Sequence, residues 1–257
     1  MDLKTNIEKY LNFNCNITCV DKTGSTNLDA KSAAQNGADE FTVILANHQT
    51  NGRGRLGRTF FSPQGSGIYL SIVLRPKFSN ENNLFITVAA AVAVCDAIKN
   101  ITGIKTGIKW VNDVYLGNKK ICGILTESAL SSDSQTPQFS VLGIGLNLYK
   151  PQSDFPADIK DIAGSLFENE TNNEIKAKLT AQIINNFKKY YDNLLNKEYL
   201  QKYRELSVIL GKEIYFLKND NKIFGTAQEI DDNAHLIVKE KCGVTHILGA
   251  GEVSVRF

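Results

Sequence analysis

Along the first part of the chain, short apolar runs typical of buried strands alternate with longer helical patterns. The predicted strands span 17–20, 41–46, 68–75, 105–110, 121–127 and 139–148. A helical stretch over 28–37 follows a group of hydroxyl residues and stops at a glycine. A second one, over 81–100, is rich in alanine and valine, as buried helices are. This order of elements predicts an α/β fold.

The pattern changes twice in the later part of the chain. From 159 to 206 it becomes helical, and a capping box at 171–174 predicts the start of one helix. From Gly211 onward it switches to short strands, at 213–217, 224–230, 236–240 and 244–250, which turn residues separate. We therefore expect two domains, a larger one over 1–210 and a small β-barrel-like one over 211–257.

Composition supports a globular protein and excludes several classes of function. The chain has 257 residues, of which 42% are hydrophobic and 22% charged, close to the globular average. A net charge of +2 argues against a protein that coats nucleic acid. Polar residues interrupt the longest apolar run, 86–98, so no membrane span is expected. The five cysteines lack paired spacing and the N-terminus lacks a signal pattern, which indicates reduced thiols in a cytoplasmic protein.

A glycine- and arginine-rich segment at 52–58, GRGRLGR, carries the first candidate chemistry. It matches the G-x-G-x-x-G pattern of dinucleotide-binding folds and, extended by Thr59, differs from a P-loop by one lysine. Both patterns need a helix directly after the glycines, whose N-terminal amides bind phosphate. Because Pro63 and Gly65 follow instead, we exclude both. A loop with three guanidinium groups remains, and its residue chemistry fits phosphate binding and a solvated basic loop equally well.

Three other segments place polar residues at the ends of predicted strands. The KWVND segment at 109–113 combines a cation, an amide and a carboxylate, which either hold a magnesium–phosphate group or form an Asx turn. Lys120 stands where a turn meets an apolar strand, which would carry its ammonium into a cleft, although a lone lysine is more often solvated. The glycines of GIGLN at 143–147 indicate close approach to the strand backbone, or simple sheet packing.

Together these segments resemble the biotin protein ligase family. The family patterns GRGRxGR, KWPND, K-hydrophobic-small-GIL and GIG-hydrophobic-N correspond to 52–58, 109–113, 120–125 and 143–147, and its Ser-Thr-Asn to 25–27. The ending over 251–256 also looks like that of the family's C-terminal domain, so the resemblance covers almost the whole chain. It implies a mixed central sheet flanked by helices, as in class II synthetase and biotin ligase catalytic folds, with a small SH3-like β-barrel at the C-terminus.

The resemblance also implies roles for individual residues. Around biotin it places Ser25, Thr26, Asn27, Gln49, Arg53, Gly54, Arg55, Lys120 and Gly123. Around ATP and the adenylate it places Arg53, Arg55, Arg58, Phe60, Asn112, Asp113, Lys120, Asn147 and Arg256. Lys120 and Arg55 would carry the catalysis, and we expect no metal ligand from the protein beyond Asp113, which would lie near magnesium. Val111 replaces the family's proline, and Phe60 replaces its tryptophan, which leaves a smaller platform for adenine.

The activity implied is that of an ATP- and Mg²⁺-dependent ligase. It would form biotinyl-AMP and transfer biotin to a lysine of biotin carboxyl carrier protein, the acetyl-CoA carboxylase subunit. Twenty-four residues precede Ser25, too few for the helix-turn-helix of the regulatory members, so no DNA partner is expected. Monomer and homodimer both remain open. Two alternatives are a lipoate–protein ligase of the same fold and a non-catalytic nucleotide- or nucleic-acid-binding module.

Overall fold

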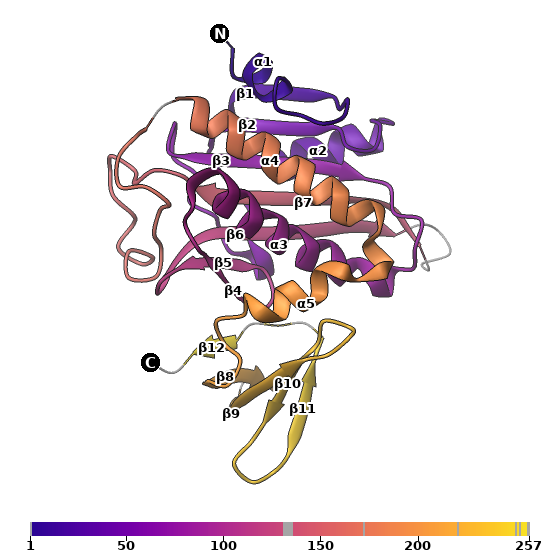
Figure 1. Cartoon of the computed structure of the whole chain (residues 1–257), viewed down its shortest axis with the longest axis vertical. Coiled ribbons are helices and arrows are strands. Elements are labelled where there is room, and N and C mark those ends of the chain that lie inside the picture. Colours follow the sequence, from indigo (N-terminus) through magenta and orange to yellow (C-terminus); the bar gives the residue numbers. More distant parts are fainter. Residues whose placement is uncertain are drawn as a thin grey trace.

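A computed structural model describes residues 2–130, 136–171, 173–219, 221–249, 251 and 253–255. Seven strands form a central sheet in the order β1-β2-β3-β7-β6-β5-β4. They are β1 (Ile17–Thr23), β2 (Val43–Gln49), β3 (Gly67–Leu74), β4 (Gly107–Lys109), β5 (Asp113–Leu116), β6 (Lys119–Leu130) and β7 (Pro137–Asn147). β1 and β2 run parallel and the other neighbours antiparallel, which confirms the mixed sheet (Figure 1).

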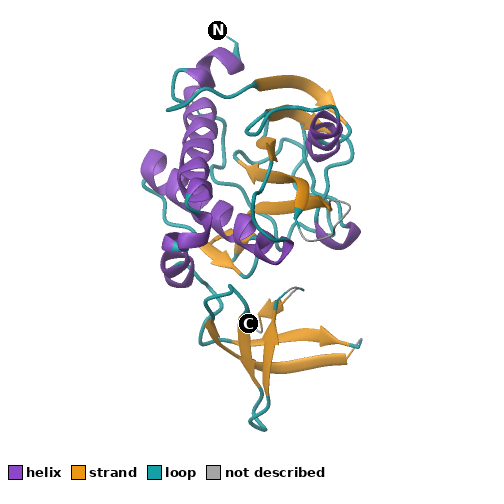
Figure 2. Cartoon of the chain, turned by 90° about the vertical axis from the view of Figure 1, so that its right-hand side faces the viewer, coloured by secondary structure: helices purple, strands orange, loops and turns teal. Residues whose placement is uncertain are grey.

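Helices cover both faces of this sheet, as Figures 1 and 2 show. α3 (Asn83–Thr102) and α4 (Asn173–Asp192) pack on one face, and α2 (Thr26–Gln35) lies on the other. The short helices α1 (Leu3–Glu8) and α5 (Glu198–Glu205) contact α4 and α3. The flanked sheet that the resemblance implied is therefore confirmed.

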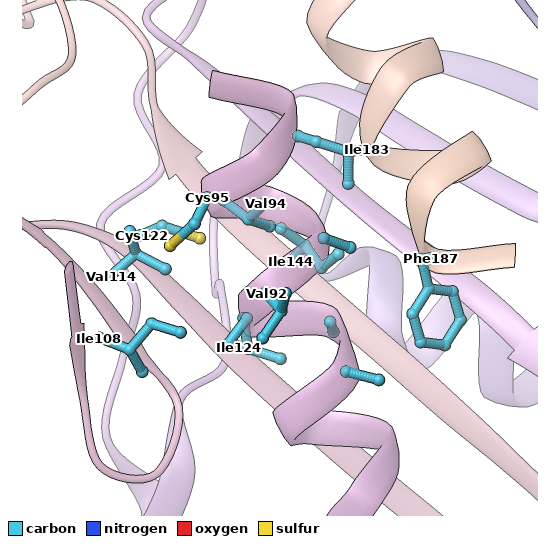
Figure 3. Packing of buried hydrophobic residues seen from close by; sticks show 14 of the residues in the cluster. Val92, Val94, Cys95, Ile108, Val114, Cys122, Ile124, Ile144, Ile183 and Phe187 are labelled. Atoms are coloured by element: carbon cyan, nitrogen blue, oxygen red, sulfur yellow. The ribbon is translucent and has the colours of Figure 1, made fainter. Parts of the chain in front are cut away.

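α3 is the centre of the hydrophobic core. Its residues from Phe85 to Ile98 are buried. Figure 3 shows Val92 near Ile124 of β6 and Ile144 of β7, with Ile183 and Phe187 of α4 in the same cluster. The helix is long and apolar enough to cross a membrane, but 78% of its apolar window is buried inside the protein, as in a core helix. The predicted buried helix is thus confirmed, with its start moved to Asn83.

Alternation along β7 separates this core from a second face. Leu142, Ile144 and Leu146 join the α3–α4 core, so Gly143 and Gly145 face the opposite side. There α2 covers only part of the sheet, over a small cluster that includes Val141. Because two glycines stand where side chains would otherwise project, other groups can approach the backbone of this face closely.

Five antiparallel strands form a second sheet at the C-terminal end, in the order β11-β10-β9-β8-β12. They are β8 (Glu213–Lys218), β9 (Asn221–Ile230), β10 (Leu236–Lys239), β11 (Thr245–Leu248) and β12 (Val253–Val255). Four were predicted and β12 was not. The expected division of the chain at Gly211 falls just before β8.

Two predictions of secondary structure were wrong. The stretch from 159 to 171, predicted helical, consists of turns and extended segments, and helix begins only at α4. The reason is tertiary pairing, because Lys120 N donates to Ile162 O at 2.7 Å and Gly164 N to Lys120 O at 2.9 Å. Residues 115–120 were predicted as a turn, but strand β5 extends into this segment as far as Leu116. The capping box includes Asn172, which lies outside the described residues.

Trp110, the only tryptophan of the chain, joins the two sheets. Its Nε1 donates to the carbonyl of Ala234 at 3.0 Å, and its side chain is buried. Ala234 belongs to the turn between β9 and β10, which the carboxylate of Asp231 holds by accepting from the backbone of Asn233 and His235 at 2.8 Å. The indole therefore fixes the C-terminal domain against the segment that carries Asn112 and Asp113.

Trp110→Phe should lower the free energy of unfolding by about 1–3 kcal/mol, because the buried Ala234 carbonyl loses its donor. Urea unfolding followed by far-ultraviolet circular dichroism measures the change. Tyr215→Phe, an aromatic change within the small sheet, is the control. A loss below about 0.5 kcal/mol, the range of ordinary surface substitutions, would contradict the role given to this bond.

Candidate functional site

A cavity of about 520 Å³ opens on the sheet face opposite α3 and α4. The loop 52–58, the segment 155–163 and residues near β12 enclose it. Its lining includes fourteen residues that the sequence predicted: Ser25, Thr26, Asn27, Gln49, Arg53, Gly54, Arg55, Arg58, Phe60, Asn112, Asp113, Lys120, Gly123 and Asn147. The remaining one, Arg256, lies outside the described residues. Segments far apart in the sequence thus meet at one site.

A polar pocket lies at the end of the cavity where α2 begins. Ser25 is the N-cap residue of α2, but its side chain does not cap the helix. Its Oγ is buried and has no hydrogen-bond partner among the residues that the structure describes. A buried hydroxyl without a partner is costly, so this atom is available to a polar group of a ligand.

Hydrogen bonds hold the other side chains of this pocket in place. Gln49 Oε1 accepts from the backbone N of Thr26 at 2.9 Å and from its Oγ1 at 3.1 Å. Ser71 Oγ, fully buried on β3, lies 2.8 Å from Thr26 Oγ1 and 2.6 Å from Asn27 Oδ1. The pocket is therefore preorganised, with few rotamers left to order on binding.

The glycine–arginine loop folds back on itself beside the pocket. Gly54 N donates to Arg58 O at 2.7 Å, and Arg53 pairs with Thr59 in an isolated bridge. Between them, residues 55–57 form a single 3₁₀ turn, and no α-helix follows before β3. The exclusion of the P-loop and the dinucleotide fingerprint is therefore confirmed.

Two contacts tie the loop to the sheet. Arg53 Nη2 lies 2.9 Å from Glu127 Oε1 on β6. Arg55 Nη1 donates to Asn112 Oδ1 at 3.0 Å, and the same amide donates through Nδ2 to the carbonyl of Ile124 at 2.9 Å. These two guanidinium groups, which line the cavity, are thus held by Glu127 of β6 and by Asn112 of the turn before β5.

The lining of the cavity carries an excess of positive charge. Its lining carries five cations, Arg53, Arg55, Arg58, Lys109 and Lys120, and two carboxylates, Asp113 and Asp158. Lys120 Nζ lies 2.6 Å from Asp113 Oδ1, so the two side chains form an ion pair. Burial, and then the charge of Asp113, raise the pKa of Tyr115 to about 12, so its phenol is neutral at pH 7. Such an excess of cations suits a polyphosphate.

Glycines form the floor of the cavity. A Cβ on Gly143 would lie 2.0 Å from Asn27 Oδ1, and one on Gly145 would lie 2.5 Å from the ring of Phe60. Gly123 pairs with Gly145 across the sheet, and its Cβ would lie 3.2 Å from the same ring. The close approach indicated by the glycines is therefore present, and Phe60 lies across this floor.

Other residues of the site were missed by the sequence reasoning. Glu127, Ser62 and Ser71 hold the predicted side chains, and residues within 155–163, together with Gly251, Val253 and Ser254, supply part of the lining. Period-2 spacing along β6 puts Glu127 on the same face as Gly123, which is the one signal that points to it. Asn147, predicted beside the adenylate, donates to the carbonyl of Gly164 at 2.9 Å and so fixes the cavity wall.

The donor set does not form a metal site held by the protein. The part of the chain that the structure describes contains no group of three or more His, Cys, Asp or Glu side chains that could hold an ion. Asp113 is one carboxylate, and it is paired with Lys120. These residues fit a cation only where substrate phosphates supply most of its ligands.

Comparison with known proteins gives one consistent result. The Biotin/lipoate A/B protein ligase family matches residues 17–147, and the biotin protein ligase C-terminal domain matches 209–256. A bifunctional ligase/repressor BirA from Bacillus spizizenii is 32% identical over 90% of this chain and 71% of its own. A biotin–[acetyl-CoA-carboxylase] ligase from Mycobacterium tuberculosis is 30% identical over 91% and 86%. The solved structure of the Aquifex aeolicus biotin protein ligase with biotin and ATP is 30% identical, with a TM-score of 0.75 over 94% and 98% of the chains.

Proposed function

Because the chain belongs to the biotin/lipoate A/B protein ligase family, we propose that it activates biotin with ATP and transfers the biotinyl group to a lysine of a protein. The observation that supports this most is the composition of the cavity described above. It joins a preorganised polar pocket with the free hydroxyl of Ser25 to a cluster of five cations. A small carboxylic acid and a nucleotide triphosphate need these two environments side by side.

In the first step, an oxygen of the biotin carboxylate attacks the α-phosphorus of ATP and pyrophosphate leaves. The nucleophile belongs to the substrate, so the protein needs no activated serine or cysteine. Two anions must approach each other, and Lys120 and Arg55 reduce their repulsion and stabilise the charge of the transition state. Magnesium, carried by the phosphates near Asp113, would supply further positive charge.

In the second step, a lysine amine of the acceptor attacks the acyl carbon and AMP leaves. We propose that the acceptor is the biotin carboxyl carrier protein of acetyl-CoA carboxylase, the enzyme that appears in the names of two relatives. We also propose that the protein acts in the cytoplasm, where its five free cysteines stay reduced.

The two alternatives have less support. A lipoate–protein ligase would share the catalytic fold, but the match of residues 209–256 is to the C-terminal domain of biotin protein ligases. A non-catalytic binding module does not account for a cavity that brings fourteen expected residues together. Binding of such a module to nucleic acid would weaken steeply with salt and release no pyrophosphate.

The deciding experiment supplies biotin, α-³²P-ATP and magnesium to the purified protein and looks for labelled biotinyl-AMP. The same reaction with lipoate in place of biotin is the matched control. Product with biotin alone supports the proposal, and product with lipoate alone would replace it by the lipoate alternative. If neither acid yields an adenylate, the proposed reaction is wrong.

The loop 52–58 gives a separate prediction about retention of the intermediate. Arg55→Ala removes the bond to Asn112, a hydrogen bond to a charged group, so the closed loop should weaken and the adenylate should escape about 10–100 times faster. Labelled adenylate in an ultrafiltrate measures its release. Leu56→Ala, which changes the exposed tip of the same loop, is the control. Equal release from both variants would show that Arg55 does not hold the loop.

A further inference from the structure

Glu127 joins two parts of the site although it is not part of the cavity lining. It lies on β6, the fifth of the seven strands in the sheet order, and its side chain is partly exposed. Oε2 accepts a hydrogen bond from Asn27 Nδ2 at 2.9 Å, and Oε1 accepts from Arg53 Nη2 at 2.9 Å. One carboxylate therefore connects the polar pocket to the glycine–arginine loop.

This connection completes a longer chain of hydrogen bonds. From Asn27 the chain continues through Ser71 and Thr26 to Gln49. Gln49 Nε2 then donates to Ser62 Oγ at 2.9 Å, and Ser62 Oγ donates to the carbonyl of Phe60 at 2.9 Å. Arg53 lies near the start of the loop and Phe60 two residues beyond its end, so both ends of the loop are linked through the polar pocket.

The chemistry of the bridge requires a carboxylate. Asn27 Oδ1 faces Ser71, so the amide presents its NH₂ group to Glu127, and a guanidinium has only donors. Two donors from opposite sides need one side chain with two acceptor atoms. Glutamine offers one acceptor and one donor, so it can satisfy one of the partners but not both.

We propose that Glu127 is a positioning residue that couples the polar pocket to closure of the arginine loop. This inference rests on the proposed function of the cavity as the biotin site. A ligand that fixes Asn27 also fixes the carboxylate, and the carboxylate then holds Arg53 over the cavity. Glu127 acts through these two side chains and does not itself touch the reacting atoms.

Limited trypsin digestion without substrate tests the coupling directly. Cleavage after Arg55 and Arg58, followed by mass spectrometry of the fragments, reports opening of the loop. Because the ion pair is partly exposed, Glu127→Gln and Arg53→Gln should each speed this cleavage only about two- to fivefold. The double variant should be cleaved no faster than either single one, since both break the same link. Asp192→Asn, which removes a surface pair on α4, should be cleaved at the wild-type rate.

Kinetic measurements add a second test, because a purely structural role for Glu127 would not change KM and kcat in different ways. Glu127→Gln should raise the KM for biotin in pyrophosphate exchange by about two- to tenfold and leave kcat within about twofold, since its contacts serve binding. Three results would each overturn the proposal. Both single variants could be cleaved at the wild-type rate, or the two effects could multiply in the double variant. In the kinetics, kcat could fall while the KM for biotin stays constant. Digestion needs no substrate, so a wild-type protein that makes no adenylate would disprove the function and still leave the coupling testable.

Discussion

Lys120→Ala is expected to slow biotin-dependent adenylation by about a hundredfold or more, since losing one preorganised charge contact typically costs about 2.7–4 kcal/mol of transition-state stabilisation. The ammonium is paired with Asp113 and lines the same cavity as Arg55. Two anions, the carboxylate and the α-phosphate, meet there in the proposed reaction. Biotin-dependent exchange of labelled pyrophosphate into ATP measures this step alone.

The fold should tolerate this change. The backbone of Lys120, and not its side chain, pairs with Ile162 and Gly164, so the strand keeps its register. Lys120→Met keeps the length of the side chain and should slow adenylation as much as Lys120→Ala does. Lys105 is an exposed lysine outside the cavity, so Lys105→Ala should adenylate biotin at the wild-type rate. If both Lys120 variants exchange pyrophosphate at rates within a few-fold of wild type, Lys120 has no role in the chemical step.

Gly143→Ala should weaken biotin binding by about 1–3 kcal/mol, a factor of roughly 5–150 in Kd, which is the usual cost of overpacking. The new methyl group would lie 2.0 Å from Asn27 Oδ1 and must displace that side chain. Asn27 would then lose its contacts to Ser71 and Glu127 together. Titration calorimetry with biotin, at a temperature where circular dichroism shows the variant folded, measures the loss.

A double variant separates this local collision from a general defect of the strand. Asn27→Ala removes the atoms that the methyl group meets, so adding Gly143→Ala to it should cost little further affinity. If the two losses simply add, the methyl group acts somewhere other than on Asn27, and the pocket geometry described above is wrong.

The main outline of the fold could be predicted because its signals are local. Apolar runs marked β1, β2, β3 and β7, and the helix α3 is almost wholly apolar because it is buried all round. The prediction for segment 159–171 failed because Ile159, Ile162 and Ala163 have helical spacing, while the backbone from Ile162 to Gly164 pairs with Lys120 on β6. The local sequence shows the preference for a helix, but it does not show the competing backbone pairing with a strand far away along the chain.

The residues of the site also fall into those that the sequence could predict and those that it could not. The loop 52–58, KWVND and the glycines of β7 were recognisable because each is a dense local pattern. Ser62, Ser71 and Glu127 are single polar residues in ordinary strands, and their importance comes only from partners far away along the chain. Contacts of this kind, which hold the binding side chains in place, become visible only once the sheet brings their strands together.

The position of β12 has a consequence for synthesis of the protein. A ribosome makes the chain from its N-terminus, so the arginine loop and the central strands emerge well before Gly251, Val253 and Ser254 complete the cavity lining. A polypeptide that stops anywhere before these residues would lack one wall of the site. It would also lack the β12–β8 pairing that completes the small sheet. Unfinished chains are therefore expected to be inactive, so a cell would not release a reactive adenylate from a half-made enzyme.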